Sequence, residues 1–262
     1  MKVLYGVQAT GNGHIARSRI MANYLKAHNI DVTFLFSGRP KEKLFDMEPF
    51  GDYMHRQGLT FVVENGKVNY LATVVNNNIA AFIYDLYSLS LDEFDLIITD
   101  FEPVTAWAAK LRRKPTIGIG HQYAFGNNTP KAGKNFIADV VMKYFAPAKK
   151  NMGLHWAPFD DTILPPIIDV NLVSKAEENK ILVYLPFENQ RKVTVLLKQF
   201  PDKHFIQYSP DVINFEDENV SLRTTCYAGF KKDLCSASGV ISNSGFELIS
   251  ECLHLGLPVL VK

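Results

Sequence analysis

A glycine-rich segment near the N-terminus ends in a histidine that could act as a base. Gly11-Asn12-Gly13-His14 follows the apolar run 3–7 and precedes residues 15–27, whose apolar side chains recur at helical spacing. Ligands bind at the carboxyl ends of strands in parallel sheets, and glycines let the backbone approach a ligand closely. At a helix N-terminus the dipole disfavours the imidazolium, so we expect His14 to be a neutral base. The alternative is a glycine-rich turn with an exposed histidine.

Carboxylates follow a second apolar run. Asp100 ends the run 96–99, and Glu102 precedes Pro103. Asp100 is expected on the same rim as His14, where it would orient the imidazole and stabilise its charged form. The alternative is that Asp100 or Glu102 caps a helix beginning near Pro103, because proline is favoured at the first helical position.

Two further polar residues follow the run 116–120. His121 and Gln122 come directly after it and are candidates for the same rim. A structural role in the loop is the alternative for both.

A second strand–loop–helix pattern lies near the C-terminus. Residues 239–242 lead through Asn243-Ser244-Gly245 to Phe246, which opens a helical pattern. Free backbone N–H groups at such a helix start can bind a diphosphate. Glu251 lies off the expected apolar stripe of this helix and could accept hydrogen bonds from ribose hydroxyls. The alternative is an ordinary capped surface helix with Glu251 as a solvated charge.

The elements that must position these residues form an alternating pattern. Unbroken apolar runs are typical of parallel strands buried on both faces. They predict strands over residues 3–7, 31–36, 60–63, 96–99 and 116–120, and again over 181–185, 205–208, 221–223, 239–242 and 258–261. Helical patterns cover 15–27, 104–111, 191–199 and 246–255. This alternation predicts a doubly wound α/β fold.

The two series of strands predict two domains, over residues 1–168 and 169–262. Between the series lies the stretch 156–166, in which Pro165-Pro166 disfavours helix and stiffens the chain. The polar segment 175–180 is expected to be exposed.

Composition excludes several classes of protein. The 262 residues are 47% apolar and 21% charged, the proportions of a soluble globular protein. Lys+Arg number 28 and Asp+Glu 27, so the net charge of +1 gives no global reason to bind nucleic acid. No apolar run approaches the roughly 18 residues of a membrane span, and no signal-peptide pattern precedes the first strand. Three cysteines without CxxC spacing argue against a disulfide framework or a zinc site and favour the cytoplasm.

Two motifs resemble a known family of enzymes. The segment from Ser244 to Glu251, followed by Gly256-Leu257-Pro258-Val259, resembles the donor-site signature of GT-B glycosyltransferases. The similarity is greatest to the bacterial lipid-intermediate N-acetylglucosaminyltransferases and the UDP-glycosyltransferases. Their Ser-Gly begins the corresponding helix, and their Glu, here Glu251, contacts the nucleotide ribose. Gly11-Asn12-Gly13-His14 resembles their glycine-rich N-terminal loop, whose histidine is the expected base. Asp100 resembles the aspartate that partners this histidine in some relatives.

The resemblance also implies a fold and a stereochemical course. It implies two Rossmann-like domains facing a cleft, an acceptor domain followed by a donor domain. Retaining members carry a second Glu eight positions before the ribose-binding one, where this chain has Asn243, so an inverting enzyme is favoured. The glycine-rich loop expected after strand 181–185 is replaced by residues 186–190, and Asn189 and Gln190 are the candidates to face the diphosphate there.

The implied activity is transfer of a sugar from a nucleotide sugar, with UDP favoured, to a hydroxyl of a lipid-linked or other acceptor. The resemblance implies no metal and no cofactor beyond the nucleotide sugar as substrate. The acceptor-side candidates are Gly11, Asn12, Gly13, Glu102, His121 and Gln122. The donor-side candidates are Asn243, Ser244, Gly245, Phe246, Glu251, Asn189 and Gln190. Two alternatives remain: a nucleotide-sugar epimerase or hydrolase on the same fold, and a non-catalytic nucleotide-sugar-binding subunit that needs a partner.

Three expectations concern the surroundings of the enzyme. Residues 131–150 interleave lysines with apolar side chains and predict a basic amphipathic helix, which could touch anionic lipid at the inner face of the membrane during cell-envelope synthesis. An ordinary helix packed on its own domain is the alternative. The chain stops directly after strand 258–261, so we expect a second domain truncated at its C-terminus. Apolar surface left exposed there would favour a homodimer.

Overall fold

The computed structural model describes residues 1–64, 67–68, 70–126, 128–131, 133 and 135–262. The chain divides into unit 1, Met1–Phe61 with Leu71–Ile167, and unit 2, Val62–Tyr70 with Ile168–Lys262. The division after Ile167 lies one residue from the boundary expected from the sequence, whereas the grouping of Val62–Tyr70 with unit 2 was not expected.

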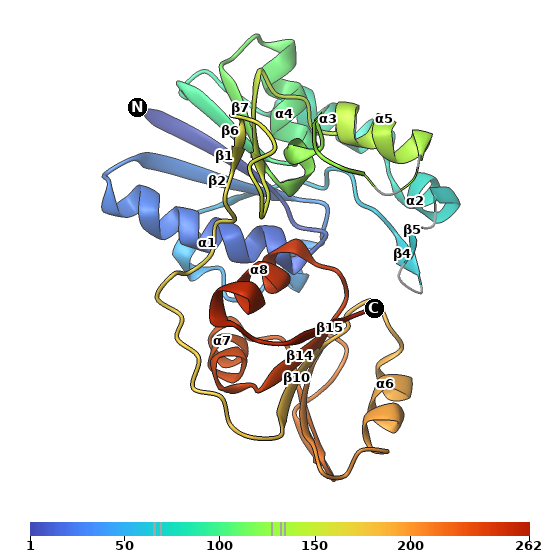
Figure 1. The fold of residues 1–262 in the computed structure, drawn as a ribbon. Coiled ribbons are helices and arrows are strands. Elements are labelled where there is room, and N and C mark those ends of the chain that lie inside the picture. The colour runs from blue at the N-terminus through green and yellow to red at the C-terminus, as the bar shows by residue number, and fades with distance from the viewer. Residues whose placement is uncertain (65–66, 69, 127, 132, 134) are drawn as a thin grey trace. The chain divides into compact units, whose positions relative to one another are not determined.

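Unit 1 is a parallel sheet between helices (Figure 1). Its strand order is β3-β2-β1-β6-β7-β8-β9, and every paired neighbour is parallel. The strands are β1 (Lys2–Gln8), β2 (Asp31–Ser37), β3 (Met54–His55), β6 (Leu96–Asp100), β7 (Thr116–Gly120), β8 (Lys150–Leu154) and β9 (Ile163–Leu164). The helices are α1 (Asn12–Ala27), α2 (Tyr70–Asn76, which begins at the boundary between the units), α3 (Ile79–Ser88), α4 (Pro103–Leu111) and α5 (Phe136–Tyr144), with the short 3-10 turns η1 (Lys41–Lys43), η2 (Glu48–Phe50) and η3 (His121–Ala124).

The core of unit 1 explains its unbroken apolar strands. Alternate side chains of a strand face opposite sides of the sheet. Leu4, Leu35 and Ile97 pack in one buried cluster with residues of α3 and α4, among them Leu86 and Val104. All residues of β1 after Lys2 are buried. Both faces of the central strands therefore lie against apolar side chains, as the sequence predicts for parallel strands.

Unit 2 repeats this architecture with six strands in the order β12-β13-β11-β10-β14-β15, parallel except for β12 against β13. The strands are β10 (Lys180–Tyr184), β11 (His204–Tyr208), β12 (Phe215–Asp217), β13 (Val220–Arg223), β14 (Gly239–Ser242) and β15 (Val259–Val261). The helices are α6 (Gln190–Leu197), α7 (Tyr227–Ser236) and α8 (Phe246–Leu255), and the hairpin of β4 (Val63–Glu64) and β5 (Lys67–Val68) belongs to this unit. The doubly wound α/β fold predicted from the sequence is confirmed.

Several helices begin at side-chain caps. Asn78, Glu102, Asn135 and Asn189 each accept a backbone N–H at the start of α3, α4, α5 and α6. In contrast, α1 and α8 begin at Gly11 and Gly245, which have no side chain to cap the helix. These are the two helices on which the candidate sites lie.

Two expectations about the elements are wrong. The strand expected over 60–63 is loop up to residue 62, and β3 at Met54–His55 takes the place beside β2. A single helix over 131–150 is also wrong, because α5 covers only Phe136–Tyr144 and β8 begins at Lys150. No helix in the described parts of the chain is long and apolar enough to cross a membrane.

Candidate functional site

His14 and Asp100 meet at the carboxyl end of the unit 1 sheet. His14 lies in the first turn of α1, directly after the loop that follows β1. Asp100 is the last residue of β6 and is paired in register with Val7 of the neighbouring β1. The imidazole Nδ1 lies 2.7 Å from Asp100 Oδ1, and the carboxylate is fully buried. Two segments 86 residues apart thus form one hydrogen-bonded pair.

A buried arginine completes this cluster. Arg17 follows His14 by three residues, so the two side chains share one face of α1. Arg17 Nε donates to Asp100 Oδ2 at 3.0 Å, and Arg17 Nη2 donates to Oδ1 at 2.5 Å. Its side chain is 1% exposed. The sequence reasoning missed Arg17. The signal available was the i, i+3 spacing from His14, which puts a charge on the face that the helix turns toward the sheet.

The ionisation of Asp100 determines which nitrogen of His14 carries a proton. Burial alone would raise the pKa of Asp100, but the charges of Arg17 and His14 and their hydrogen bonds bring it below its ordinary value. Asp100 is therefore a carboxylate at neutral pH. A contact of 2.7 Å between it and Nδ1 requires a proton on the nitrogen. We assign this Nδ1–H tautomer, which leaves Nε2 of His14 with a lone pair, as a general base needs.

Arg17 also lies directly beside His14. Its Nη2 lies 3.1 Å from His14 Nδ1, and both groups face the same oxygen of Asp100. The cluster therefore combines a carboxylate that orients His14 with a guanidinium that binds the same carboxylate.

Gln122 reaches His14 from the third strand of the rim. It lies in η3, directly after β7, and its amide Nε2 is 3.2 Å from His14 Nε2. Because that imidazole nitrogen carries the lone pair, the amide is the donor. Gln122 Oε1 is buried and has no hydrogen-bond partner, a state that typically costs about 1–3 kcal/mol.

Gly120 allows these groups to approach one another. Its φ is +149°, a conformation rare for other residues. A Cβ atom there would lie 3.2 Å from Asp100 Oδ1, 3.3 Å from Gln122 Oε1 and 3.4 Å from Arg17 Nη2. A side chain would therefore press on all three groups at once.

His121 has a structural environment beside this cluster. Its Nδ1 is hydrogen-bonded to the carbonyl oxygen of Leu154 at 2.9 Å. Its ring packs near Phe125, His155 and Trp156, with centroid separations of 4.8, 5.4 and 6.2 Å. Burial lowers its pKa below the ordinary 6.5, so it is neutral at pH 7.

Glu102 is a helix cap, which confirms the alternative interpretation of this residue, and its full burial does not fit its place among the acceptor-side candidates. Its carboxylate accepts from the backbone N–H groups of Val104 and Thr105, both at 2.7 Å, and from Ser37 Oγ at 2.6 Å. It is fully buried, which raises its pKa, while the hydrogen bonds that it accepts oppose the shift. Phe101, with φ of +53°, turns the chain sharply between Asp100 in the cluster and Glu102 in the cap.

The glycine loop leaves the start of α1 uncapped. Gly11 is the N-cap residue, and a Cβ atom on it would meet nothing within 4 Å. Asn12 instead accepts from Arg39 Nη1 through its Oδ1 at 2.7 Å, and Arg39 Nη2 donates to the carbonyl oxygen of Thr10 at 3.1 Å. Gly13 follows within the first turn.

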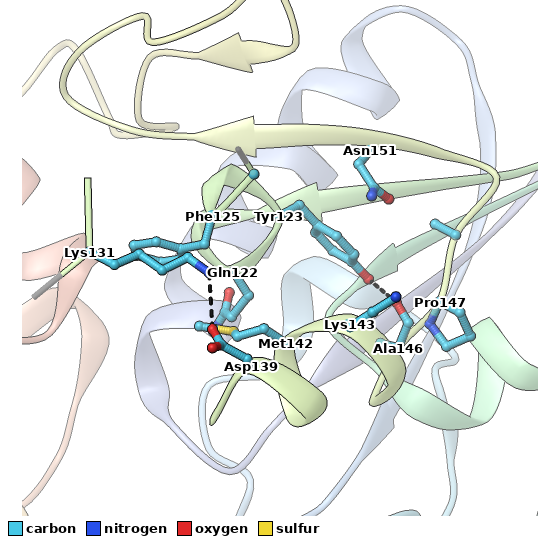
Figure 2. A pocket seen from close by; sticks show the side chains of 12 residues that line it. Gln122, Tyr123, Phe125, Lys131, Asp139, Met142, Lys143, Ala146, Pro147 and Asn151 are labelled. Atoms are coloured by element: carbon cyan, nitrogen blue, oxygen red, sulfur yellow. Dashed lines mark hydrogen bonds and ion pairs between the residues drawn. The ribbon is translucent and has the colours of Figure 1, made fainter. Parts of the chain in front are cut away.

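A cavity of about 380 Å³ opens beside Gln122 (Figure 2). Gln122 and Tyr123 of η3 line it, and Met142 and Lys143 of α5 lie across from them. Its rim carries an ion pair of 2.9 Å between Lys131 and Asp139. The lining mixes apolar, amide and charged groups, and Gln122 is shared between this cavity and the base.

In unit 2, the start of α8 offers backbone donors. Ser244 is exposed, Gly245 is the N-cap residue without a side-chain bond, and Phe246 begins the helix. Asn243 Nδ2 is 3.5 Å from Glu188 Oε1, while Asn243 Oδ1 is buried without a hydrogen-bond partner. The start of α8 therefore lacks a side-chain cap, and backbone N–H groups at such a helix N-terminus can bind anions.

Asn189 and Gln190 have local roles that do not match the expected contact with a diphosphate. Asn189 caps α6 by accepting the backbone N–H of Lys192 at 3.0 Å. Gln190 donates to the carbonyl oxygens of Leu185 and Glu188, both at 2.8 Å, and its Oε1 accepts from Gln207.

Glu251 is buried and forms an ion pair with Lys231 of α7. Glu251 was expected off the apolar stripe of its helix, and its burial also excludes the alternative of a solvated charge. Glu247 and Leu248 of the same helix are also buried, whereas Leu253 is 58% exposed. A ribose that reached Glu251 would have to share its carboxylate with Lys231.

In the described residues, no group of three or more His, Cys, Asp or Glu side chains is placed to hold a metal ion.

Comparisons with known proteins agree with this fold. The family described as Glycosyl transferase family 1 matches residues 1–261. No curated protein matches the chain. Among solved structures, the glycosyltransferase SnogD from Streptomyces nogalater is 15% identical, with a TM-score of 0.58 over 100% of this chain and 81% of its own. UGT89C1 from Arabidopsis thaliana, complexed with UDP, is 12% identical, with a TM-score of 0.59 over 99% and 79%. The UDP-GlcNAc 2-epimerase from Neisseria meningitidis, bound to UDP-GlcNAc, is 16% identical, with a TM-score of 0.57 over 100% and 82%.

Proposed function

The chain belongs to glycosyl transferase family 1 and is a nucleotide-sugar-dependent glycosyltransferase, and we propose that it inverts the anomeric centre with His14 as general base. The observation that carries this proposal is the hydrogen-bonded pair of His14 and ionised Asp100, which presents a lone pair on Nε2. The acceptor hydroxyl gives its proton to Nε2 as its oxygen attacks the anomeric carbon. Asp100 stabilises the imidazolium that results. A positioned base of this kind contributes about 10²–10⁴-fold to the rate.

The start of α8 is the proposed site for the leaving group. The bond between the anomeric carbon and the diphosphate oxygen breaks, and its electron pair leaves with the nucleoside diphosphate. Backbone N–H groups at the helix start, near Ser244 and Phe246, would hold this charge without a metal. The uncapped Gly245 supports this assignment. The UDP bound to UGT89C1 and the UDP-GlcNAc bound to the epimerase make a UDP-sugar the favoured donor here.

The acceptor is proposed to enter through the cavity of unit 1. Gln122 connects that cavity to His14, so a molecule bound there lies beside the base. Helix α5, which lines the cavity with Met142 and Lys143, has no buried residue. Four of its apolar side chains are exposed, Phe136, Ile137, Val140 and Tyr144. We therefore favour a lipid-linked acceptor and a peripheral contact of α5 with the membrane. Lys134, which belonged to the expected basic face, lies outside the described residues.

Replacement of the base tests this proposal. His14→Ala should lower turnover by about two orders of magnitude and leave UDP affinity within about twofold, because the imidazole acts in the transition state. The matched control is His28→Ala, which removes an exposed histidine just beyond the other end of α1. The assay supplies radiolabelled UDP-sugars with a bacterial lipid extract and measures label in lipid together with UDP release. Near-full activity of His14→Ala would contradict the mechanism. Formation of an epimerised UDP-sugar without acceptor would favour the epimerase alternative instead.

A further inference from the structure

Gln122 covers the atom of His14 that the proposed reaction needs. Its amide donates to the lone pair on His14 Nε2 at 3.2 Å. An acceptor hydroxyl must donate to the same lone pair before it can lose its proton. The two donors therefore compete for one position, and the hydroxyl can enter only when the amide leaves.

The side chain that blocks His14 also lines the cavity beside it. Figure 2 shows Gln122 at the cavity wall, among side chains that include Tyr123, Asp139 and Met142. A molecule that fills this cavity contacts Gln122 directly, whereas a single water molecule does not fill a space of about 380 Å³. Occupancy of the cavity and release of the amide are thus linked by contact.

The hydrogen bonding of the Gln122 side chain is incomplete in this position. Its Oε1 is buried and lacks a hydrogen-bond donor. An acceptor that presents a hydrogen-bond donor in the cavity would supply the partner that Oε1 lacks. The amide can therefore exchange its contact with His14 for contacts in the cavity.

We infer that Gln122 is a positioning residue that guards the base: it occupies His14 Nε2 until an acceptor in the cavity displaces it, and so limits hydrolysis of the donor. In hydrolysis, water attacks the anomeric carbon, the bond to the diphosphate breaks, and His14 takes the proton of the water. Water meets a covered base, whereas a bound acceptor meets an open one. This inference rests on the proposed function of His14 and concerns the choice between water and acceptor.

Two variants of Gln122 test the inference, with one control. Gln122→Ala removes the amide, and Gln122→Met keeps about the same length without a donor. Gln57→Ala is the control, since Gln57 is an exposed glutamine of the same unit. Circular dichroism and the thermal midpoint establish that each variant is folded, and Gln122→Met serves if Gln122→Ala does not fold.

The first measurement needs no substrate. Diethylpyrocarbonate acylates neutral imidazole nitrogens, and mass spectrometry of peptides gives the rate at each histidine. At pH 7, His14 should react about fivefold faster in both Gln122 variants, the effect of losing one neutral hydrogen bond. Exposed His28 should react at an unchanged rate in every protein and serves as the internal reference. Equal rates at His14 in the wild type and both variants would overturn the inference.

The second measurement separates the guard from the proposed function. UDP release from UDP-N-acetylglucosamine and UDP-glucose is followed without acceptor and, with lipid extract, is compared with transfer of label. The ratio of hydrolysis to transfer should rise about fivefold in both Gln122 variants and stay constant in Gln57→Ala. If transfer occurs and depends on His14 while this ratio does not change, the guard is refuted and the general base stands. If no protein turns over either donor while His14 acylation rises, the covering of Nε2 stands and the proposed function fails.

Discussion

Removal of the charge on Asp100 should destabilise unit 1 far more than removal of a surface charge. In Asp100→Asn, Arg17 stays buried with a full positive charge and loses its carboxylate partner. Removal of one member of a buried ion pair typically costs about 3–5 kcal/mol in free energy of unfolding. The two hydrogen bonds from Arg17 agree with this magnitude, since hydrogen bonds to charged groups contribute about 1.5–3 kcal/mol each. We expect a loss of about 4 kcal/mol at pH 7.

The loss should depend on pH in a defined direction. The pKa of Asp100 is below its ordinary 3.8 in the folded protein. A depressed carboxyl pKa stabilises the fold above the unfolded value, and that stability disappears as the pH falls through the folded value. The difference between wild type and Asp100→Asn should therefore be present at pH 7 and should shrink as the solution becomes more acidic than the ordinary carboxyl pKa of 3.8.

Urea denaturation followed by tryptophan fluorescence measures this loss in the right unit. The protein contains two tryptophans, Trp107 and Trp156, and both lie in unit 1. Asp139→Asn is the control, because Asp139 pairs with Lys131 at the surface and should contribute no more than about 1 kcal/mol. The double variant Asp100→Asn with Arg17→Met should recover part of the loss, since it leaves no unpaired buried charge. A loss below about 1 kcal/mol for Asp100→Asn would refute the reasoning.

Three further outcomes are expected. Glu102→Ala should lower the free energy of unfolding of unit 1 by about 1–3 kcal/mol, because it removes a buried cap, and a change no larger than that of Asp139→Asn in the same urea assay would contradict the capping role. Glu251→Ala should weaken UDP binding about tenfold in calorimetry, because a charge-assisted hydrogen bond is lost, and unchanged affinity in a folded variant would remove Glu251 from the site. Replacement of exposed Phe136 and Ile137 by Ser should reduce cosedimentation with anionic phospholipid vesicles at low salt, and a wild type that does not sediment with them would defeat the membrane contact.

The sequence predicts the parts of the site that depend on strand order. Strand ends in a parallel sheet share an edge, so placing Asp100 near His14 needs only the two apolar runs before them. The structure brings these two side chains together. Arg17 could not be assigned in this way, because its role depends on which face of α1 meets the sheet.

Other parts depend on tertiary contacts that a linear pattern does not contain. The sequence leaves Glu102 open between a site residue and a helix cap, and it does not predict the hydrogen bond from Ser37, which lies 65 residues away. Likewise the sequence places Glu251 off the apolar stripe of its helix, and it does not predict the ion pair with Lys231 on another helix. β3 is only two residues long, so no periodicity marks it.

The order of three neighbouring strands gives the site an unusual tolerance to change in chain length. Three adjacent strands position the site, namely β1, β6 and β7. At or just beyond their carboxyl ends lie His14, Asp100 and Gln122. The segments that connect these strands lie outside the sheet. Insertions in those connections would alter the surface and leave the distances among the three side chains unchanged. A slip of β6 by one residue against β1 would be different, because it would move Asp100 to the opposite face of the sheet. Insertions in the connections should therefore leave the site intact, whereas deletions inside the strands should destroy it.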